Sequence, residues 1–168
     1  MITRSIRRIN RPTIFGNILK YRPPKLIGMR DKNQSIILKN VSKSDFQFLY
    51  ELLSERDPRA NISHKKMPTY KEHLKFIKSK PYSRWYIIYY NNEKTGSIYL
   101  SKQNEIGIFI KNEMQGKGIG RNALKLIMEK NGPGRYLANI NPKNKKSIQF
   151  FKKNGFKLIQ YTYEFMKP

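Results

Sequence analysis

Three short apolar segments follow one another between residues 84 and 111, and their close spacing limits the fold more than any other feature. The segments are "RWYIIYY", "GSIYL" and "EIGIFIK", and only "NNEKT" and "SKQN" separate them. Connections this short join neighbouring strands in opposite directions, because a parallel pair needs a crossover of a dozen or more residues. The sequence therefore predicts an antiparallel meander of three strands.

A strand and two helices are predicted before the meander. Residues 35–41, "SIILKNV", are typical of a strand. Residues 44–53, "SDFQFLYELL", place Phe46, Leu49 and Leu53 on one face of a helix. A second helix, "YKEHLKFIK", is predicted by the T-x-x-E pattern at its start, in which the two side chains satisfy unpaired backbone amides.

Two further helices and two strands are predicted after the meander. The segment at residues 122–130, "NALKLIMEK", has apolar residues at helical spacing, and "NGPG" ends it. We expect a short strand at residues 135–140, a helix at residues 145–154 and an alternating strand at residues 156–165. Alternation of helices and strands in this order predicts an α/β fold.

The composition limits the chemistry of the site. The chain has no cysteine, so disulfides, thiolate metal sites and a cysteine nucleophile are excluded, and a reducing, cytoplasmic location is the default expectation. No apolar run approaches the roughly 18 to 20 residues that cross a bilayer. No cluster of metal ligands is predicted, and we expect no metal.

The net charge of +24 favours anionic partners, namely a phosphorylated cofactor, a nucleotide-linked substrate, nucleic acid or an anionic membrane. The chain is also rich in Lys, Ile and Asn, a bias that AT-rich codon usage produces without selection for binding. Charge alone therefore does not identify the partner.

The N-terminal fifth of the chain is more basic than the rest. Residues 1–34 contain nine Lys or Arg and one acid, so we expect a basic arm followed by one domain at residues 35–168. The start of the arm is typical of an amphipathic surface helix or, over residues 1–28, of an organelle transit peptide. A nucleic-acid or ribosome-binding arm, an arm that packs on its own domain, and a natural start at Met29 remain alternatives.

A glycine-rich loop, "QGKGIG" at residues 115–120, joins the last strand of the meander to a helix. Glycine lets the backbone approach a phosphate closely, and a helix N-terminus offers unpaired N–H groups and a positive dipole end. The loop lacks the G-K-[ST] ending of a P-loop, and it follows an antiparallel meander rather than a βαβ unit. It therefore predicts a phosphate ligand other than those of the two best known glycine loops.

The loop resembles the Q/R-x-x-G-x-G/A acyl-CoA signature of the GNAT superfamily of N-acyltransferases. Residues 141–156, "NPKNKKSIQFFKKNGF", are similar to that superfamily's next motif. The resemblance covers residues 35–168 and does not include the arm. It implies a GNAT fold, with a mixed central sheet whose parallel strands splay apart and about four flanking helices, and an acetyltransferase that uses acetyl-CoA (coenzyme A).

The resemblance also implies which residues hold the cofactor. The strand at residues 106–110 is expected to carry a bulge and to meet the pantetheine arm, the glycine loop to bind the pyrophosphate through main-chain N–H groups, and the second motif to lie beside them. The implied cofactor contacts are Ile108, Phe109, Ile110, Gln115, Gly116, Lys117, Gly118, Ile119, Gly120, Asn144, Ser147 and Phe151. A helix cap is the alternative role for Asn144.

The chemistry implied by the resemblance is attack of a neutral amine on a thioester, which needs a route for the ammonium proton. Glu105 begins the strand at which many superfamily members place a carboxylate base. His64 and His73 are further candidates, because a histidine has a suitable pKa for this work. The alternatives are a surface charge for Glu105 and a packed helix residue for His73.

One position departs from the superfamily pattern. The common general acid is a tyrosine four residues before the closing glycine of the second motif, and Phe151 stands there. Water, Tyr136, Tyr163 or unaided departure of the thiolate are the alternatives, as is slow or lost transfer.

The acceptor amine is predicted from a weaker resemblance. The run "NISHKKMPTYKEHLKFIKSK", with "GSIYLS" and "NEIGIFI", is similar to the branch that acetylates nucleotide-linked amino sugars, such as the enzymes of the pseudaminic acid pathway. We therefore expect a small, anionic amine substrate. Two alternatives remain: acetylation of protein N-termini, especially of ribosomal proteins, and a non-catalytic module that binds RNA or a membrane surface.

Overall fold

A computed structural model describes residues 35–56, 66–163 and 165. The predicted arm at residues 1–34 and the candidate base His64 lie outside the described residues.

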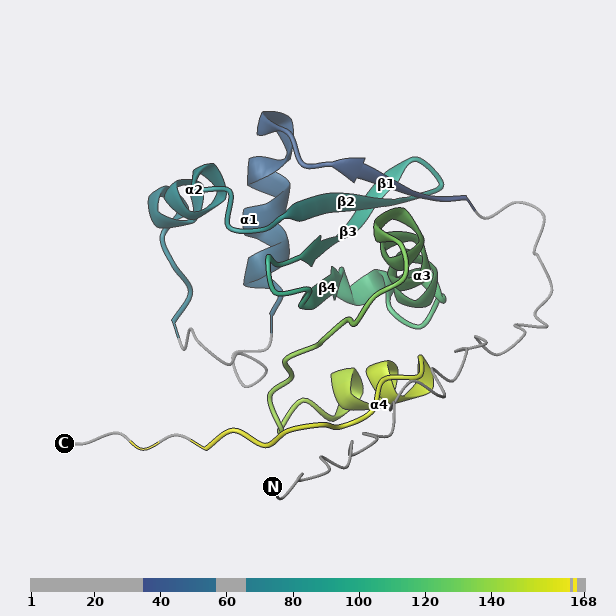
Figure 1. Cartoon of the computed structure of the whole chain (residues 1–168). Coiled ribbons are helices and arrows are strands. Elements are labelled where there is room, and N and C mark those ends of the chain that lie inside the picture. Colours follow the sequence, from purple (N-terminus) through teal and green to yellow (C-terminus); the bar gives the residue numbers. More distant parts are fainter. Residues whose placement is uncertain (1–34, 57–65, 164, 166–168) are drawn as a thin grey trace, which may run out of the picture. The chain divides into compact units, whose positions relative to one another are not determined.

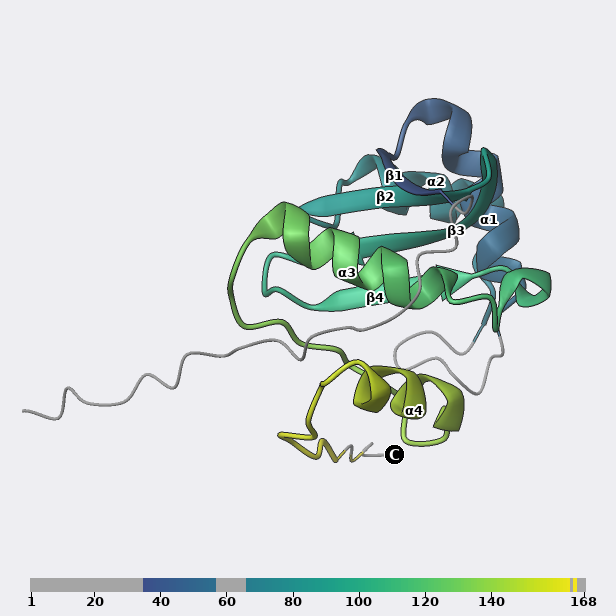
Figure 2. The same ribbon diagram turned by 90° about the vertical axis from the view of Figure 1, so that its right-hand side faces the viewer.

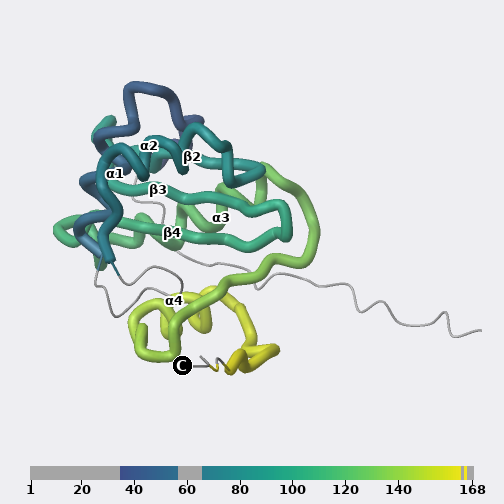
Figure 3. Tube along the Cα trace, turned by 90° about the vertical axis from the view of Figure 1, so that its left-hand side faces the viewer, coloured from purple at the N-terminus to yellow at the C-terminus, as the bar shows by residue number. Residues whose placement is uncertain are grey.

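Four strands form one antiparallel sheet in the order β1-β2-β3-β4 (Figure 1), and Figure 3 shows β2, β3 and β4 side by side from another direction. The predicted meander is confirmed, and the predicted first strand lies beside it. The strands are β1 (Ile36–Asn40), β2 (Arg84–Tyr90), β3 (Glu93–Leu100) and β4 (Ile106–Ile110).

The turn between β2 and β3 is shorter than the polar segment "NNEKT" suggested. Asn91 and Asn92 make the turn with φ angles of 49° and 67°, a left-handed conformation that asparagine tolerates. The register between β2 and β3 shifts at Ile88, where the Thr95 hydroxyl donates to the Ile88 carbonyl oxygen (3.2 Å). The bulge expected in residues 106–110 is absent, because the pairing of β3 with β4 is regular throughout.

The larger core lies between the sheet and α3 (Ile119–Asn131), which packs on β1, β3 and β4 (Figure 2). Alternate strand residues point to this face, and α3 meets them with apolar residues at i, i+3 and i+4 spacing. The buried residues of this core are Leu38, Tyr86, Ile88, Ile98, Leu100, Ile106, Ile119, Ala123, Leu124, Ile127 and Phe151.

A smaller core lies on the other face of the sheet, under α1 (Phe46–Ser54) and α2 (Tyr70–Lys78). Its buried residues are Leu49, Ile77 and Ile87. In α1 the second buried residue is Leu52, whereas the predicted Leu53 is half-buried, so the buried face is rotated from the predicted one.

The capping box predicted for α2 is confirmed. The Glu72 backbone N–H donates to the Thr69 hydroxyl oxygen (3.3 Å), and the Thr69 backbone N–H donates to the Glu72 carboxylate (2.7 Å). Two donors at the helix start are thereby satisfied, which fixes where α2 begins.

Asp45, in the short 3-10 helix η1 (Lys43–Asp45), joins α1 to β3. Its side chain accepts from the Ser42 backbone N–H (2.8 Å) and pairs with Lys94 (2.8 Å). Burial raises the pKa of Asp45, but the hydrogen bonds from Lys94 and Ser42 lower it more, so this pKa lies below its ordinary value. A depressed folded-state pKa stabilises the fold above the ordinary value of about 4 and loses that effect as the pH falls through the folded pKa.

We therefore expect Asp45→Asn to lower the free energy of unfolding at neutral pH, and its difference from the wild type to shrink below about pH 4. Urea unfolding of both proteins at about pH 7 and pH 3 measures this difference. A difference that is the same at both pH values would contradict the role of the charged carboxylate.

The two strands predicted after the meander are not strands in the structure. Of residues 135–140, only Leu137 forms a bridge, a parallel one with Glu105. Residues 156–163 have no regular structure, and Tyr163 is 91% exposed. Alternating apolar residues give a segment one apolar face, but a strand also needs hydrogen bonds to the edge of a neighbouring strand. In the described structure, β4 makes such a pairing with the following segment only at the bridge between Glu105 and Leu137. The last helix, α4 (Lys145–Lys153), forms as predicted.

None of the helices within the described part of the chain combines the length and apolarity needed to cross a membrane.

Candidate active site

The glycine loop leaves β4 through a short 3-10 helix, η3 (Asn112–Met114), and enters α3 (Figure 2). Gly116 and Gly118 have φ angles of +81° and +76°. A Cβ atom at either position would meet no other heavy atom within 4 Å. Open space therefore lies beside the loop backbone at both glycines, and the backbone conformation there favours glycine.

The start of α3 has unpaired backbone donors. Gly118 is the N-cap residue and has no side chain to cap the helix. The first bond near the helix start runs from the Asn122 N–H to the Gly118 carbonyl oxygen (3.2 Å). The N–H groups of Ile119, Gly120 and Arg121 precede that bond and lack helical partners, as at any uncapped helix start. Such donors, together with the helix dipole, fit a pyrophosphate.

Side chains around the loop have mostly structural contacts. Gly120 leaves room for α4, because a Cβ there would lie 3.2 Å from the Phe150 ring. The Lys117 ammonium lies 3.3 Å from the Met114 sulfur. The Gln115 amide returns to β4, where it donates to the Ile110 carbonyl oxygen (3.2 Å). Ile119 is 1% exposed. Phosphate binding here would therefore use mainly the backbone.

The pairing of β3 with β4 determines which amides of β4 are free. The Lys111 N–H donates to the Thr95 carbonyl oxygen (2.9 Å), and the Ser101 N–H donates to the Glu105 carbonyl oxygen (2.9 Å). Hydrogen-bonded and non-hydrogen-bonded pairs alternate along an antiparallel ladder. The odd-numbered residues from 105 to 111 therefore direct their backbone groups toward β3.

The even-numbered residues of β4 direct their backbone N–H and carbonyl groups to the open edge of the sheet. The Ile106 N–H follows this pattern and donates to the Leu137 carbonyl oxygen (2.8 Å). Ile108 and Ile110 come next on the same edge, beyond the single bridge with the following segment. Phe109 faces β3 with its backbone, so its N–H group is not available for the contact with the cofactor that the resemblance implied for this strand. In the part of the chain that the structure describes, the free N–H donors at this edge belong to Ile108 and Ile110.

Glu105 lies where β4 begins, and its carboxylate is held in place from two sides. The Asn139 side-chain amide donates to one oxygen (2.8 Å), and the Ser101 hydroxyl donates to the other (3.2 Å). Its side chain belongs to the same face of β4 as Gly107 and Phe109, because alternate residues share a face. The carboxylate is thus fixed on the α1/α2 face of the strand.

His73 shares none of these contacts with Glu105 and lies among aromatic side chains of α1 and α2. It is 6% exposed, and its ring centroid lies 5.6 Å from that of Tyr50 and 6.4 Å from that of Phe76. Burial lowers the pKa of His73, and its Nε2 has no hydrogen-bond partner among the described residues. This environment is that of a packed helix residue, which was the alternative to a catalytic role for His73. Within the described ranges, no group of three His, Asp or Glu side chains is placed to hold a metal ion.

The second motif forms the start and one face of α4. The Ser147 N–H donates to the Asn144 side-chain oxygen (3.0 Å), so Asn144 caps this helix. Phe151 is 6% exposed and packs against Phe150 and Phe156 with ring centroids 5.1 and 5.0 Å away. Phe151 therefore supplies apolar packing and no proton.

The two alternative tyrosines differ in their surroundings. The Tyr136 hydroxyl donates to the Gly132 carbonyl oxygen (2.6 Å), just past the C-terminal end of α3 and thus at the far end of that helix from the glycine loop. Tyr163 is 91% exposed.

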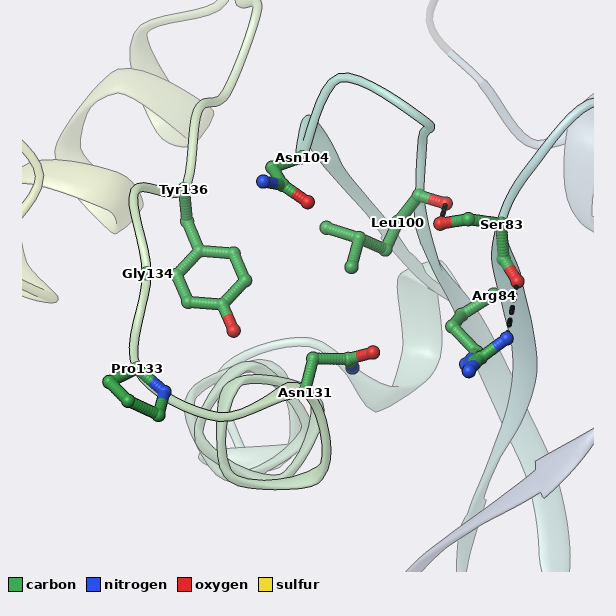
Figure 4. Close-up of a pocket in the computed structure, with 8 residues that line it drawn as sticks. All are labelled: Ser83, Arg84, Leu100, Asn104, Asn131, Pro133, Gly134 and Tyr136. Carbon is green, nitrogen blue, oxygen red and sulfur yellow. Dashed lines mark hydrogen bonds between the residues drawn. The ribbon is translucent and has the colours of Figure 1, made fainter.

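A cavity of about 250 Å³ lies next to Tyr136 (Figure 4). Several of its polar groups are already bonded. The Ser83 hydroxyl donates to the Leu100 carbonyl oxygen (2.8 Å), and the Arg84 guanidinium donates to the Ser83 carbonyl oxygen (3.1 Å). The cavity lies at the end of α3 opposite the glycine loop, so we do not assign it to the acyl-CoA site.

The α1/α2 face of β4 contains residues that the sequence did not single out. Tyr99 stands opposite Gly107 in the β3–β4 pairing, and a Cβ at position 107 would overlap the Tyr99 ring. Tyr82 stacks on Tyr99 with a centroid distance of 3.7 Å, and burial raises the pKa of Tyr82. The Arg56 guanidinium lies over the Phe109 ring at 5.1 Å. The sequence signal for the close approach of Tyr99 to the strand was Gly107, a glycine inside an apolar strand pattern.

Comparisons with known proteins agree with this geometry. The sequence profile of the Acetyltransferase (GNAT) domain matches residues 35–157. No curated protein sequence shows a significant match to the chain. Among solved structures, a domain from Methanocaldococcus jannaschii DSM 2661 is 28% identical with a TM-score of 0.69, and the match covers 79% of this chain and 94% of that one.

Two further solved structures share the fold at lower identity, and both contain coenzyme A. RimL, a ribosomal L7/L12 alpha-N-protein acetyltransferase, is 19% identical with a TM-score of 0.60, over 75% of this chain and 82% of that one. The aminoglycoside N-acetyltransferase AAC(6')-Iy is 14% identical with a TM-score of 0.62, over 83% and 99% of the two chains. With a family profile that matches most of its length, the chain belongs to the GNAT acetyltransferase family and is an acetyl-CoA-dependent N-acetyltransferase.

Proposed function

We propose that the acceptor is the primary amine of a nucleotide-linked amino sugar, and that it binds on the α1/α2 face of β4. The observation that carries this proposal is the combination of Arg56 with the stacked rings of Tyr82 and Tyr99 beside Gly107. A sugar nucleotide offers a diphosphate and flat rings. A guanidinium binds a diphosphate through charge-assisted hydrogen bonds, and aromatic side chains stack on flat rings.

The position of this face relative to the cofactor supports the proposal. Ile108 and Ile110 present their N–H groups at the edge of β4, whereas Gly107 and Phe109 present their α1/α2 face to the acceptor. Gly107 has no side chain, and the Tyr99 ring occupies that space, so an aromatic ring lies over the strand between Glu105 and Phe109. The net charge of +24 also favours an anionic acceptor over a cationic one.

The chemistry requires a proton route and a polarised carbonyl. Bound acetyl-CoA supplies an acetyl thioester, from which the acetyl group passes to the amine nitrogen as the thiol is released. The N–H groups of Ile108 and Ile110 are the donors available to the thioester oxygen. Glu105 precedes Ile108 by three residues, about 10 Å of strand, so its carboxylate would receive the ammonium proton through water.

A peptide N-terminus is the second candidate acceptor. The likeness to RimL favours it, because that protein acetylates an N-terminus and shares the fold at a TM-score of 0.60. The α1/α2 face of β4, which we call the acceptor face, carries the Arg56 guanidinium, and this group can bind the carboxylates of an acidic peptide.

The test is transfer itself, measured as thiol release from acetyl-CoA with three acceptors: a UDP-linked amino sugar, the same amino sugar without the nucleotide, and a set of peptides with free N-termini. We expect the UDP-linked sugar to have the highest kcat/KM. Arg56→Ala should raise its KM about tenfold while the Kd of acetyl-CoA stays unchanged. Arg84→Ala is the matched control, since Arg84 is an exposed arginine of the same sheet and bonds only its neighbour's carbonyl oxygen in the described structure.

If peptides are acetylated and the UDP-linked sugar is not, the proposed sugar acceptor is wrong and a peptide N-terminus is the acceptor. Salt-dependent RNA binding without acetyl-CoA binding would favour the non-catalytic alternative instead.

A second variant tests the acceptor face directly. Gly107→Ala would place a methyl group in the Tyr99 ring, so that Tyr99 must leave its stack on Tyr82. We expect kcat/KM for the acceptor to fall at least about tenfold, because a displacement of about 1 Å in a positioned site costs up to 100-fold. The Kd of acetyl-CoA, measured by calorimetry, should change little. An unchanged kcat/KM for the acceptor would contradict the assignment of this face.

A further inference from the structure

The C-terminal end of α1 is hydrogen-bonded to the segment that leads into the glycine loop. The Asn112 backbone N–H donates to Oε2 of Glu55 (2.8 Å). The Asn112 side-chain amide donates to the Glu55 carbonyl oxygen (3.4 Å). These residues are 57 positions apart in the sequence. Two bonds therefore connect a helix on the acceptor face with the cofactor loop.

Asn112 passes this contact on to Gln115, the first residue of the loop. The Gln115 side-chain amide donates to the Asn112 side-chain oxygen (3.1 Å) and to the Ile110 carbonyl oxygen (3.2 Å). The Gln115 backbone N–H donates to the Asn112 carbonyl oxygen (3.3 Å). Both ends of the Asn112 amide are thus in use, one toward Glu55 and the other toward Gln115, which fixes its orientation.

The loop beyond Gln115 has little else to hold it. Gly116 and Gly118 have no side chains, and open space surrounds the positions of their missing Cβ atoms. Glycine backbone loses more conformational freedom on ordering than that of any other residue. A loop that is ordered before the ligand arrives lowers the cost of binding, because that entropy has already been lost during folding.

We propose that Glu55 is a positioning residue for acetyl-CoA binding: through Asn112 and Gln115 it holds the glycine loop in its binding conformation before the cofactor arrives. Cofactor affinity then depends on a carboxylate that lies outside both acyl-CoA motifs. The next residue, Arg56, lies over Phe109 on the acceptor face. Consecutive residues at the end of α1 therefore serve the two halves of the site.

The test uses the full chain and acetyl-CoA alone, without an acceptor, so its outcome does not depend on the proposed amine. The variants are Glu55→Ala, Glu55→Gln and the control Glu51→Ala. Glu51 belongs to the preceding turn of α1, and its carboxylate accepts from Gln47 (2.9 Å). The Kd of acetyl-CoA is measured by calorimetry at a temperature where all variants are folded, and the free energy of unfolding is measured by urea titration.

Glu55→Ala is expected to raise the Kd of acetyl-CoA about tenfold, a typical loss for a hydrogen bond to a charged group. Glu55→Gln should recover most of the affinity, because its amide oxygen accepts the same N–H donor. Glu51→Ala should bind as the wild type does. A Kd within twofold of the wild type for Glu55→Ala would overturn the proposal and leave Glu55 with a structural role only. Equal losses in Glu55→Ala and Glu55→Gln would overturn the hydrogen-bond explanation.

Discussion

Gly118→Asp is expected to weaken acetyl-CoA binding by at least about 100-fold, whereas Gly118→Asn should keep most of the affinity. Both side chains have nearly the same shape, and both Asp and Asn enter the left-handed region, where φ is +76° at this position, more readily than other residues. A Cβ at this position meets no neighbour within 4 Å, so neither variant causes a steric clash there, and both carry the same backbone strain of the left-handed conformation. The difference between them is one negative charge at the start of α3.

The size of the effect follows from the charge. Two like charges about 4 Å apart near a protein surface repel by about 4 kcal/mol, and each 1.4 kcal/mol changes an affinity tenfold. Calorimetry with acetyl-CoA measures this, and ATP and inorganic pyrophosphate serve as controls because a protein with a net charge of +24 binds polyanions in general. Equal affinity of the Asp and Asn variants for acetyl-CoA would place the pyrophosphate elsewhere.

Ile127→Ala is expected to lower the free energy of unfolding by about 2 to 5 kcal/mol, the usual cost of an isoleucine cut back to alanine in a core. Ile127 is fully buried, and it packs α3 onto the sheet. Ile127→Val should cost about 0.5 to 1.5 kcal/mol, because the cavity it leaves is one methylene in size. Ile37→Ala is the control, since Ile37 of β1 is 43% exposed.

Urea unfolding of the three variants and the wild type measures these differences. The order of stability should be wild type, then Ile127→Val, then Ile127→Ala, with Ile37→Ala close to the wild type. A loss at Ile37 as large as that at Ile127 would contradict the assignment of the two faces of the sheet.

Local sequence patterns were enough to predict most of the elements. The spacing of the three apolar segments determined the meander, because connections of four or five residues allow only antiparallel neighbours. The capping box at Thr69 and Glu72 determined where α2 begins, and glycines at positions 116 and 118 marked the junction of β4 with α3. The cofactor contacts of the loop stay predictions, although its open backbone and unpaired donors fit them.

Features that depend on long-range pairing were predicted less well. Residues 156–165 alternate as a strand would, but residues 156–163 have no strand partner in the described structure. The resemblance named both Phe109 and Ile110 as cofactor contacts, and only the register of β3 against β4 shows that the backbone of Ile110 faces the open edge whereas that of Phe109 does not.

The sequence by itself determined the family and the position of the loop, because both depend on residues that are close together along the chain. The tertiary structure alone placed His73 in an aromatic cluster away from Glu105, and brought Tyr82 and Tyr99 onto Gly107. It also joined Glu55 to Asn112, 57 positions away. The physical reason is that capping, turns and helical periodicity act over a few residues, whereas a site is assembled by packing between segments that no local pattern relates.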